Sequence, residues 1–205
     1  TKPETFEKAI TPKTKALFCE SIANPGGVIV DLAAIGAIAK KHGIPLIVDN
    51  TLATPYLVKP RDHGADIIVH SATKFLGGHG NSIGGILVDC GTFDWIKAGN
   101  RYPTPTAPNA SYNGMVLAET FGNFAFAIAA RVMGLRDIGP AIAPFNAFLI
   151  TTGMETLPLR MRQHCDNAQA AAEHLSRHPK VAWVNYAFQR ERQVVEADRH
   201  VRMVA

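Results

Sequence analysis

The lysine at position 74 follows a short apolar stretch and stands among hydroxyls and glycines. Residues 67–69 (Ile-Ile-Val) have the pattern of a buried strand, Ser71 and Thr73 precede Lys74, and a glycine-rich run, residues 77–85, follows it. A lysine just past the end of a buried strand is expected in a crevice, where loss of water favours the neutral amine. Because the neutral amine is a nucleophile, Lys74 is a candidate for covalent chemistry.

A carboxylate ends the preceding apolar stretch. Residues 44–48 are expected to form a strand, and Asp49 follows directly. The carboxyl ends of parallel strands meet at one edge of a sheet, so Asp49 and Lys74 are expected to share that edge. Pyridoxal phosphate needs a lysine that forms a Schiff base and an acid that keeps its pyridine nitrogen protonated. These two residues therefore predict a pyridoxal-phosphate site, although Asp49 alone also suits the cap of a turn.

The elements before Lys74 are typical of a parallel sheet. A strand over residues 16–20 leads through the turn Asn24-Pro-Gly-Gly27 to a helix that Asp31 caps and Gly43 ends. Strand, helix and strand with short joints form a βαβ unit, whose crossover implies parallel strands. The third and fourth strands are expected at residues 66–70 and 84–89. The predicted fold class is α/β.

Helical patterns dominate the second half of the chain. The expected helices cover residues 115–134, 140–151 and 155–177, and residues 181–186 are expected to form a strand that opens a second domain. We therefore predict one domain over residues 1–150 and the start of another over residues 151–205. The charge-rich end, residues 187–205, is set apart as a separate tail.

Composition excludes several function classes. The 205 residues are 47% hydrophobic and 19% charged, and the net charge of +4 is scattered, so no nucleic-acid surface is predicted. No apolar run reaches the length of a membrane span. Three widely spaced cysteines suit reduced thiols in the cytoplasm, and Cys19 is expected as a small core residue. His79 has no second ligand at a suitable spacing, so no metal site is predicted.

Several motifs resemble the pyridoxal-phosphate enzymes of cysteine and methionine metabolism. The motifs are Asp49-Asn-Thr51 with Pro55-Tyr56, His63-Gly-Ala-Asp66 and Ser71-Ala-Thr-Lys-Phe75. The group contains the cystathionine synthases and lyases, methionine γ-lyase and the O-acylhomoserine sulfhydrylases. Within it, residues 18–27, 77–85 and 155–160 look most like the O-acetylhomoserine sulfhydrylases.

The resemblance implies a fold and roles for five residues. The fold would be that of the type I, aspartate aminotransferase-like pyridoxal-phosphate enzymes. Lys74 would form the Schiff base and later move protons between Cα and Cγ of the substrate, and Asp49 would pair with the pyridine nitrogen. The hydroxyls of Ser71 and Thr73 would bind the cofactor phosphate. Asn24 would lie near the phenolic oxygen of the cofactor and the carboxylate of the substrate.

The resemblance also implies an activity and an assembly. It implies γ-replacement on the small amino acid O-acetylhomoserine by sulfide or a thiol, which gives homocysteine or methionine plus acetate. Enzymes of this group are usually homotetramers built from dimers, with sites at the dimer interface. The resemblance begins in the middle of a domain, so the chain is expected to be a fragment with about half a site. Two alternatives stay open: a γ-lyase that acts on methionine or cystathionine, and a non-catalytic remnant or interaction partner.

Overall fold

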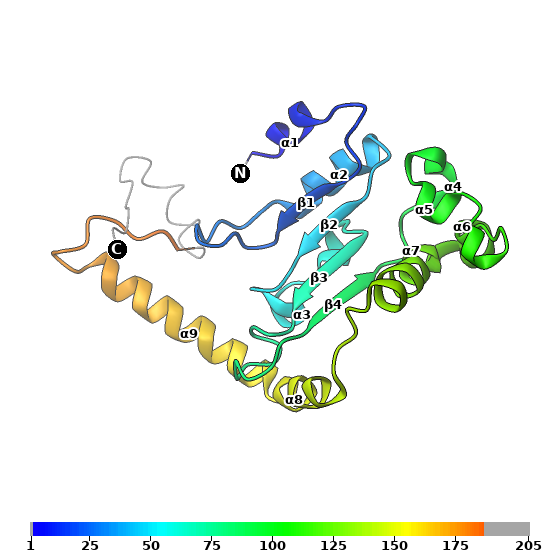
Figure 1. The fold of residues 1–205 in the computed structure, drawn as a ribbon. Coiled ribbons are helices and arrows are strands. Elements are labelled where there is room, and N and C mark those ends of the chain that lie inside the picture. The colour runs from blue at the N-terminus through cyan, green and yellow to red at the C-terminus, as the bar shows by residue number, and fades with distance from the viewer. Residues whose placement is uncertain (1, 187–205) are drawn as a thin grey trace.

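The computed structural model describes residues 2–186 and has a mixed four-stranded sheet at its centre (Figure 1). The strands are β1 (Leu17–Glu20), β2 (Leu46–Asp49), β3 (Ile67–Ser71) and β4 (Gly85–Asp89), in that order across the sheet. The first three strands are parallel, as the βαβ pattern predicted. β4 runs antiparallel to β3 and forms an edge. The predicted α/β class is confirmed.

Helix α2 (Leu32–Lys41) covers one face of this sheet. It begins where the Asp31 side chain accepts a hydrogen bond from the Ala34 backbone N–H at 3.0 Å, and it ends before Gly43, whose φ of +60° suits glycine. Side chains alternate along a strand, so every second residue of β1 and β2 faces this helix. The resulting core contains Leu17, Cys19, Leu46, Val48 and, from α2, Leu32, Ile35 and Ala39. Cys19 is therefore a core residue, as predicted.

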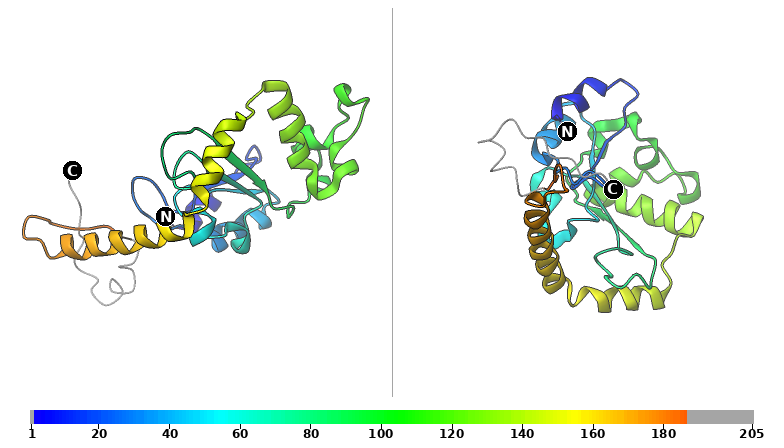
Figure 2. Two further views of the ribbon diagram at one scale, coloured as in Figure 1. Left: turned by 90° about the horizontal axis from the view of Figure 1, so that it is seen from below. Right: turned by 90° about the vertical axis from the view of Figure 1, so that its left-hand side faces the viewer.

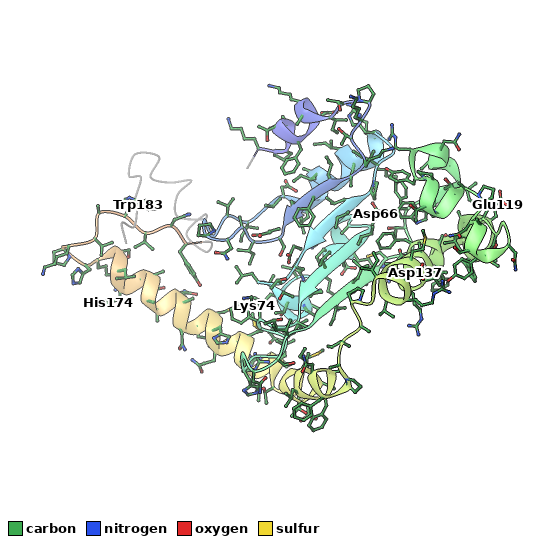
Figure 3. The ribbon with its side chains drawn as sticks, in the orientation of Figure 1. Asp66, Lys74, Glu119, Asp137, His174 and Trp183 are labelled. Carbon is green, nitrogen blue, oxygen red and sulfur yellow. The ribbon has the colours of Figure 1, made fainter. Side chains whose placement is uncertain are left out.

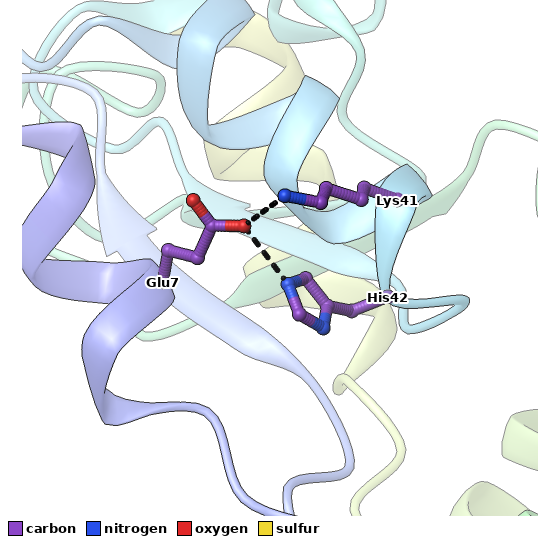
Figure 4. A network of polar contacts seen from close by, with 3 residues as sticks. All are labelled: Glu7, Lys41 and His42. Carbon is purple, nitrogen blue, oxygen red and sulfur yellow. Dashed lines mark hydrogen bonds and ion pairs between the residues drawn. The ribbon is translucent and has the colours of Figure 1, made fainter.

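Figure 4 shows how helix α1 (Pro3–Ala9) is attached to the end of α2. Glu7 Oε1 accepts from Lys41 Nζ at 2.7 Å and contacts His42 Nε2 at 3.1 Å. The bonds from Lys41 and His42 lower the pKa of Glu7. Exposed pairs of this kind stabilise weakly, so α1 is a peripheral element.

The opposite face of the sheet is only half covered. Near the start of β3, an aromatic cluster packs on Ile47 and Ile67, with Trp95 of α4 (Trp95–Ala98) stacked on Phe126 of α7 (Ala125–Ala129) at 5.6 Å between ring centroids. Toward the carboxyl ends of the parallel strands this cover stops. Phe18 on β1 is 58% exposed and Leu87 on β4 is 50% exposed. We call this uncovered half the open face.

The remaining helices are short, with two exceptions at the end of the described chain. The others are α3 (Thr54–Leu57), α5 (Pro103–Thr106), α6 (Leu117–Phe121), α8 (Pro144–Met154) and α9 (Leu157–Ser176), with 3-10 turns at Pro60–His63, Gly99–Arg101, Ala110–Tyr112 and Gly122–Phe124. Helix α9 begins beside the sheet and extends away from it (Figure 2). None of the helices in the described part of the chain is long and apolar enough to cross a membrane.

Two predictions of secondary structure are wrong. Residues 115–134 do not form one helix. Helix α6 ends at Phe121, because Gly122 has a φ of +51° that is not helical, and α7 continues as a π-helix over Ala130–Ile138. Residues 181–186 form no strand. Helix α8 runs across the predicted domain boundary at residue 150, so the division into residues 1–150 and 151–205 stays a prediction. The tail, residues 187–205, lies outside the described residues.

Candidate active site

The carboxyl ends of the three parallel strands are aligned at one edge of the sheet. Glu20 pairs with Asp49, and Asp49 pairs with Val69, two residues before Ser71. Register partners point to the same side of a sheet, as do residues two apart in one strand. The side chains of Glu20, Asp49 and Ser71 therefore share the open face. Glu20 is a neighbour of the candidate site that the sequence reasoning missed.

Asp49 keeps one oxygen available. Its Oδ1 accepts from the Thr51 backbone N–H at 2.8 Å, while Thr51 Oγ1 accepts from the Ser71 backbone N–H at 2.8 Å. These bonds fasten the turn after β2 to the end of β3. Asp49 Oδ2 has no hydrogen-bond partner among residues 2–186. Both predicted roles of Asp49, turn cap and partner of a nitrogen, are thus compatible with its two oxygens.

Asn50 holds the same turn from inside. It is completely buried, and its side-chain amide is bonded at both ends: Oδ1 accepts from Ser21 Oγ at 2.7 Å and Nδ2 donates to the Val58 carbonyl at 2.9 Å. Its backbone N–H donates to the Val69 carbonyl. The side chain of Asn50 therefore fixes the end of β2 relative to β1, and its backbone N–H fixes it relative to β3. The only signal in the sequence was its place inside the motif Asp49-Asn-Thr51.

Ser71, Thr73 and Lys74 follow one another at the end of β3, but their side chains differ. The Ser71 hydroxyl has no partner in the described part of the chain. Thr73 Oγ1 donates to the Gly84 carbonyl at 3.2 Å and accepts from the Gly84 N–H at 3.1 Å, so it closes the turn between β3 and β4. Whether these hydroxyls also bind a phosphate stays a prediction.

Lys74 lies at the end of the sheet, beside the first turns of α9 (Figure 3). Its side chain is exposed, and within the described residues Nζ makes no hydrogen bond or ion pair. The sequence predicted a crevice around this lysine, and that prediction is wrong for this chain. The reason is that the open face beside it has no covering layer.

Asn24 belongs to the same edge. It lies in the turn after β1, is exposed, and its backbone N–H donates to Glu20 Oε2 at 2.7 Å. The bond ties this turn to the end of β1, and the side-chain amide has no partner in the described residues. The structure thus brings all five predicted residues, from the ends of three strands, to one edge.

His70 lies next to these residues in sequence but on the other face. It is buried, and Nδ1 has no hydrogen-bond partner in the described part of the chain. Burial lowers the pKa of His70, although a backbone bond at Asn50 and the charge of Asp49 oppose this shift. A neutral imidazole on the opposite face is not placed to act as a base at the candidate site.

Two cavities in the described residues lie away from this edge of the sheet. One of about 770 Å³ is at the opposite edge of the sheet, where Asp66, Arg61 and Lys97 contribute to its walls. Another of about 640 Å³ is apolar and lies at the aromatic cluster of Trp95 and Phe126. Neither cavity is lined by a residue predicted for the candidate site.

A family model described as "Cys/Met metabolism PLP-dependent enzyme" matches residues 1–204. The chain belongs to this family. Its curated relatives include an O-acetyl-L-homoserine sulfhydrylase of Leptospira meyeri, 52% identical over 192 residues, and a homocysteine synthase of Schizosaccharomyces pombe, 50% identical over 185 residues. Each alignment covers 90% of this chain and 43% of the relative. The chain thus spans less than half the length of these relatives.

A solved structure shows the same fold. It is described as an O-acetylhomoserine (thiol)-lyase from Campylobacter jejuni and contains N'-pyridoxyl-lysine-5'-monophosphate. It matches this chain with a TM-score of 0.84 and 41% identity, over 90% of this chain and 46% of that one. The predicted membership of a pyridoxal-phosphate fold is therefore confirmed.

The side chains at this edge of the sheet fit the cofactor of this family. Pyridoxal phosphate presents an aldehyde, a pyridine nitrogen and a phosphate. The free amine of Lys74, the free oxygen of Asp49 and the free hydroxyl of Ser71 are groups that react with or bind these three. The fit lies in the chemistry of these three groups and in their position at the same edge of the sheet.

Proposed function

We propose that this chain carries the lysine-bearing part of an enzyme that replaces the acetoxy group of O-acetylhomoserine with sulfide or a thiol. The products are homocysteine or methionine, plus acetate. The observation that carries the proposal is that Asp49 ends β2 and Lys74 follows the end of β3, its parallel neighbour, so both lie at the carboxyl edge of the sheet. The names of the relatives, sulfhydrylases and homocysteine synthases, favour replacement over γ-elimination.

Each of the five predicted residues has a role in the proposal. Pyridoxal phosphate, when bound, supplies an electron sink next to the substrate Cα. Asp49 keeps a positive charge on the ring nitrogen, and Ser71 and Thr73 bind the phosphate. Asn24 orients the substrate carboxylate. Lys74 would hold the cofactor and, once displaced by the substrate, would remove and return the protons at Cα and Cβ.

The bond changes at Cγ balance without a further reagent. The Cγ–O bond breaks and its electron pair leaves with acetate, while the sulfur nucleophile supplies the pair of the new Cγ–S bond. The protons removed at Cα and Cβ are returned when the product forms, so no oxidant or reductant is consumed. The Lys74 amine has no hydrogen-bond partner in the described residues. A flexible amine of this kind suits a proton carrier that must reach two carbons.

The assembly and location complete the proposal. We propose a homo-oligomer, a tetramer built from dimers, as the resemblance to the family implies. The three cysteines are unpaired, which supports a reducing compartment such as the cytoplasm.

The test uses the covalent chemistry of Lys74. The purified chain is incubated with pyridoxal phosphate, reduced with borohydride and digested, and pyridoxyl-lysine is quantified by mass spectrometry at Lys74 and at the exposed Lys59. We expect preferential labelling of Lys74 and its loss in Lys74→Ala, with Lys59→Ala unchanged. Equal labelling of both lysines contradicts the proposal.

A product assay separates the reactions. O-acetylhomoserine with sulfide is expected to give homocysteine and acetate, and Lys74→Ala is expected to lower the rate at least about a hundredfold. Release of ammonia and a keto acid without sulfide would instead identify a lyase.

A further inference from the structure

Arg160 bonds the turn that follows Lys74 to helices α8 and α9. Its Nη1 donates to the Phe75 carbonyl at 2.8 Å and its Nη2 to the Leu76 carbonyl at 3.2 Å. Nη2 also donates to the Gly153 carbonyl at 2.8 Å, and Nε donates to Thr156 Oγ1 at 3.1 Å. No carboxylate of the described residues pairs with this guanidinium. Its hydrogen bonds go mainly to backbone carbonyls, which a planar fork of donors suits.

Two glycines allow this close approach. A Cβ on Gly78, whose φ is +74°, would lie 2.5 Å from Arg160 Cζ. A Cβ on Gly153 of α8 would meet the carbonyl of Gly77. The backbone of the turn therefore lies directly against the guanidinium on one side and against α8 on the other. A turn built in this way has little freedom to move.

The same turn contains the backbone of Lys74. The Gly78 N–H donates to the Lys74 carbonyl at 2.8 Å, and the Gly77 N–H donates to the Ala72 carbonyl at 2.9 Å. Leu76 is buried with Ile150, Leu157 and other apolar side chains of α8 and α9. Fixing residues 75–78 thus fixes the backbone from which the Lys74 side chain extends.

We propose that Arg160 is a positioning residue for Lys74. It clamps residues 75–78 against α8 and α9 and thereby sets the direction in which the Lys74 amine leaves the sheet. Arg160 touches neither substrate nor cofactor in this role. The inference rests on the proposed function for the part that the Lys74 amine plays. A purely structural role would change the stability of the chain but not the preference of the cofactor for Lys74 over other lysines.

The first test compares Arg160→Gln with Arg162→Gln. Arg162 lies on the same helix, is exposed and makes no bond in the described part of the chain, so both variants lose one charge but only one loses the clamp. Two quantities are measured: amide hydrogen exchange of residues 75–78, and the ratio of pyridoxyl labelling at Lys74 to that at Lys59. We expect Arg160→Gln to speed exchange in this turn and to lower the ratio about tenfold or more. Arg162→Gln should match the unchanged chain.

A second pair of variants leaves Arg160 in place. Gly78→Ala pushes a methyl group into the guanidinium, whereas Gly80→Ala carries a similar positive φ, +65°, with nothing within 4 Å of the added carbon. Both variants bear the same kind of backbone strain. We expect Gly78→Ala to lower the labelling ratio and Gly80→Ala to keep it. If Arg160→Gln unfolds the whole chain, this pair of variants tests whether Arg160 positions Lys74.

The outcomes separate the inference from the proposed function. If the unchanged chain labels Lys74 no faster than Lys59, the proposed function fails. The role of Arg160 as a clamp is then tested by amide hydrogen exchange alone. Faster exchange confined to residues 75–78 in Arg160→Gln then supports the clamp, and unchanged exchange overturns it. If the unchanged chain does prefer Lys74, an equal preference in Arg160→Gln and Gly78→Ala overturns the inference and leaves the proposed function intact.

Discussion

Cys19 is a buried thiol on the strand that precedes the Asn24 turn. Burial raises its pKa from the ordinary value of 9.0 to about 11. It packs with Leu17, Leu46 and Val48 beneath α2. A thiol in these surroundings stays protonated, so Cys19 acts as a small apolar side chain and not as a nucleophile.

This shift predicts a loss of stability at high pH. Below about pH 9 the thiol is neutral in both the folded and unfolded chain, and its contribution to stability is fully present. Between about 9 and about 11 it ionises first in the unfolded chain, so the free energy of unfolding falls as pH rises. Between about pH 8 and about pH 11, we expect the free energy of unfolding to fall less for Cys19→Ala than for the unchanged chain. Urea titrations at both pH values measure the two falls. Identical falls in both proteins would show that Cys19 has no part in the effect.

The junction between helix α8 and the glycine run after β3 depends on backbone contact. Gly153 leaves no room for a side chain against Gly77, and Gly77 itself has the Ala72 carbonyl only 2.9 Å from the position of an added Cβ. Close-packed backbones of this kind do not relax by rotating a side chain. The arrangement of α8, the Lys74 turn and α9 therefore depends on these small residues.

Replacing a helical glycine is expected to destabilise the chain only where the glycine packs directly against another backbone segment. Gly153→Ala should destabilise the chain by about 1–3 kcal/mol, as overpacked substitutions do. Gly134→Ala has open space around the added carbon and should be neutral or stabilising by up to about 1 kcal/mol. Urea unfolding of the two variants measures both values. A Gly153→Ala protein as stable as Gly134→Ala would mean that α8 can shift without cost.

The molecule as a whole leaves much apolar surface uncovered. Besides Phe18 and Leu87, large exposed side chains occur at Ile83 and at Phe145 and Phe148 of α8. Every residue of β4 is at least partly exposed, so neither face of this edge strand is fully covered. Exposed apolar patches of this extent mark surfaces that another chain or segment covers.

We expect this surface to make the isolated chain associate and bind an apolar dye. Replacing Phe18 and Leu87 together by serine should lower the fluorescence of bound anilinonaphthalene sulfonate and shift size-exclusion elution toward the monomer. A double variant of Leu159, 72% exposed on α9, and Ile96, 60% exposed on α4, serves as a control for lost apolar area elsewhere. An equal effect of both double variants would mean that the open face has no special role in association.

The sequence by itself determined the βαβ unit and the edge at which the candidate site lies. Asp31, the apolar positions of α2 and Gly43 set the βαβ unit, because caps and periodicity act within a few residues. Parallel strands then align Asp49 with the end of β3 for geometric reasons, so Lys74, Asp49 and Ser71 could be placed together without coordinates. Their roles came from the resemblance of motifs to a family, which the match over residues 1–204 bears out for membership.

Only the tertiary structure decided how these residues are held. Arg160 bonds carbonyls at residues 75 and 76, more than eighty positions away, and Asn50 bonds Ser21 and Val58. The direction of β4, the break at Gly122 and the exposure of Lys74 likewise depend on what packs against each segment. Composition and periodicity report what each residue prefers locally, whereas these features arise from contacts between residues far apart in the chain, which no local pattern records.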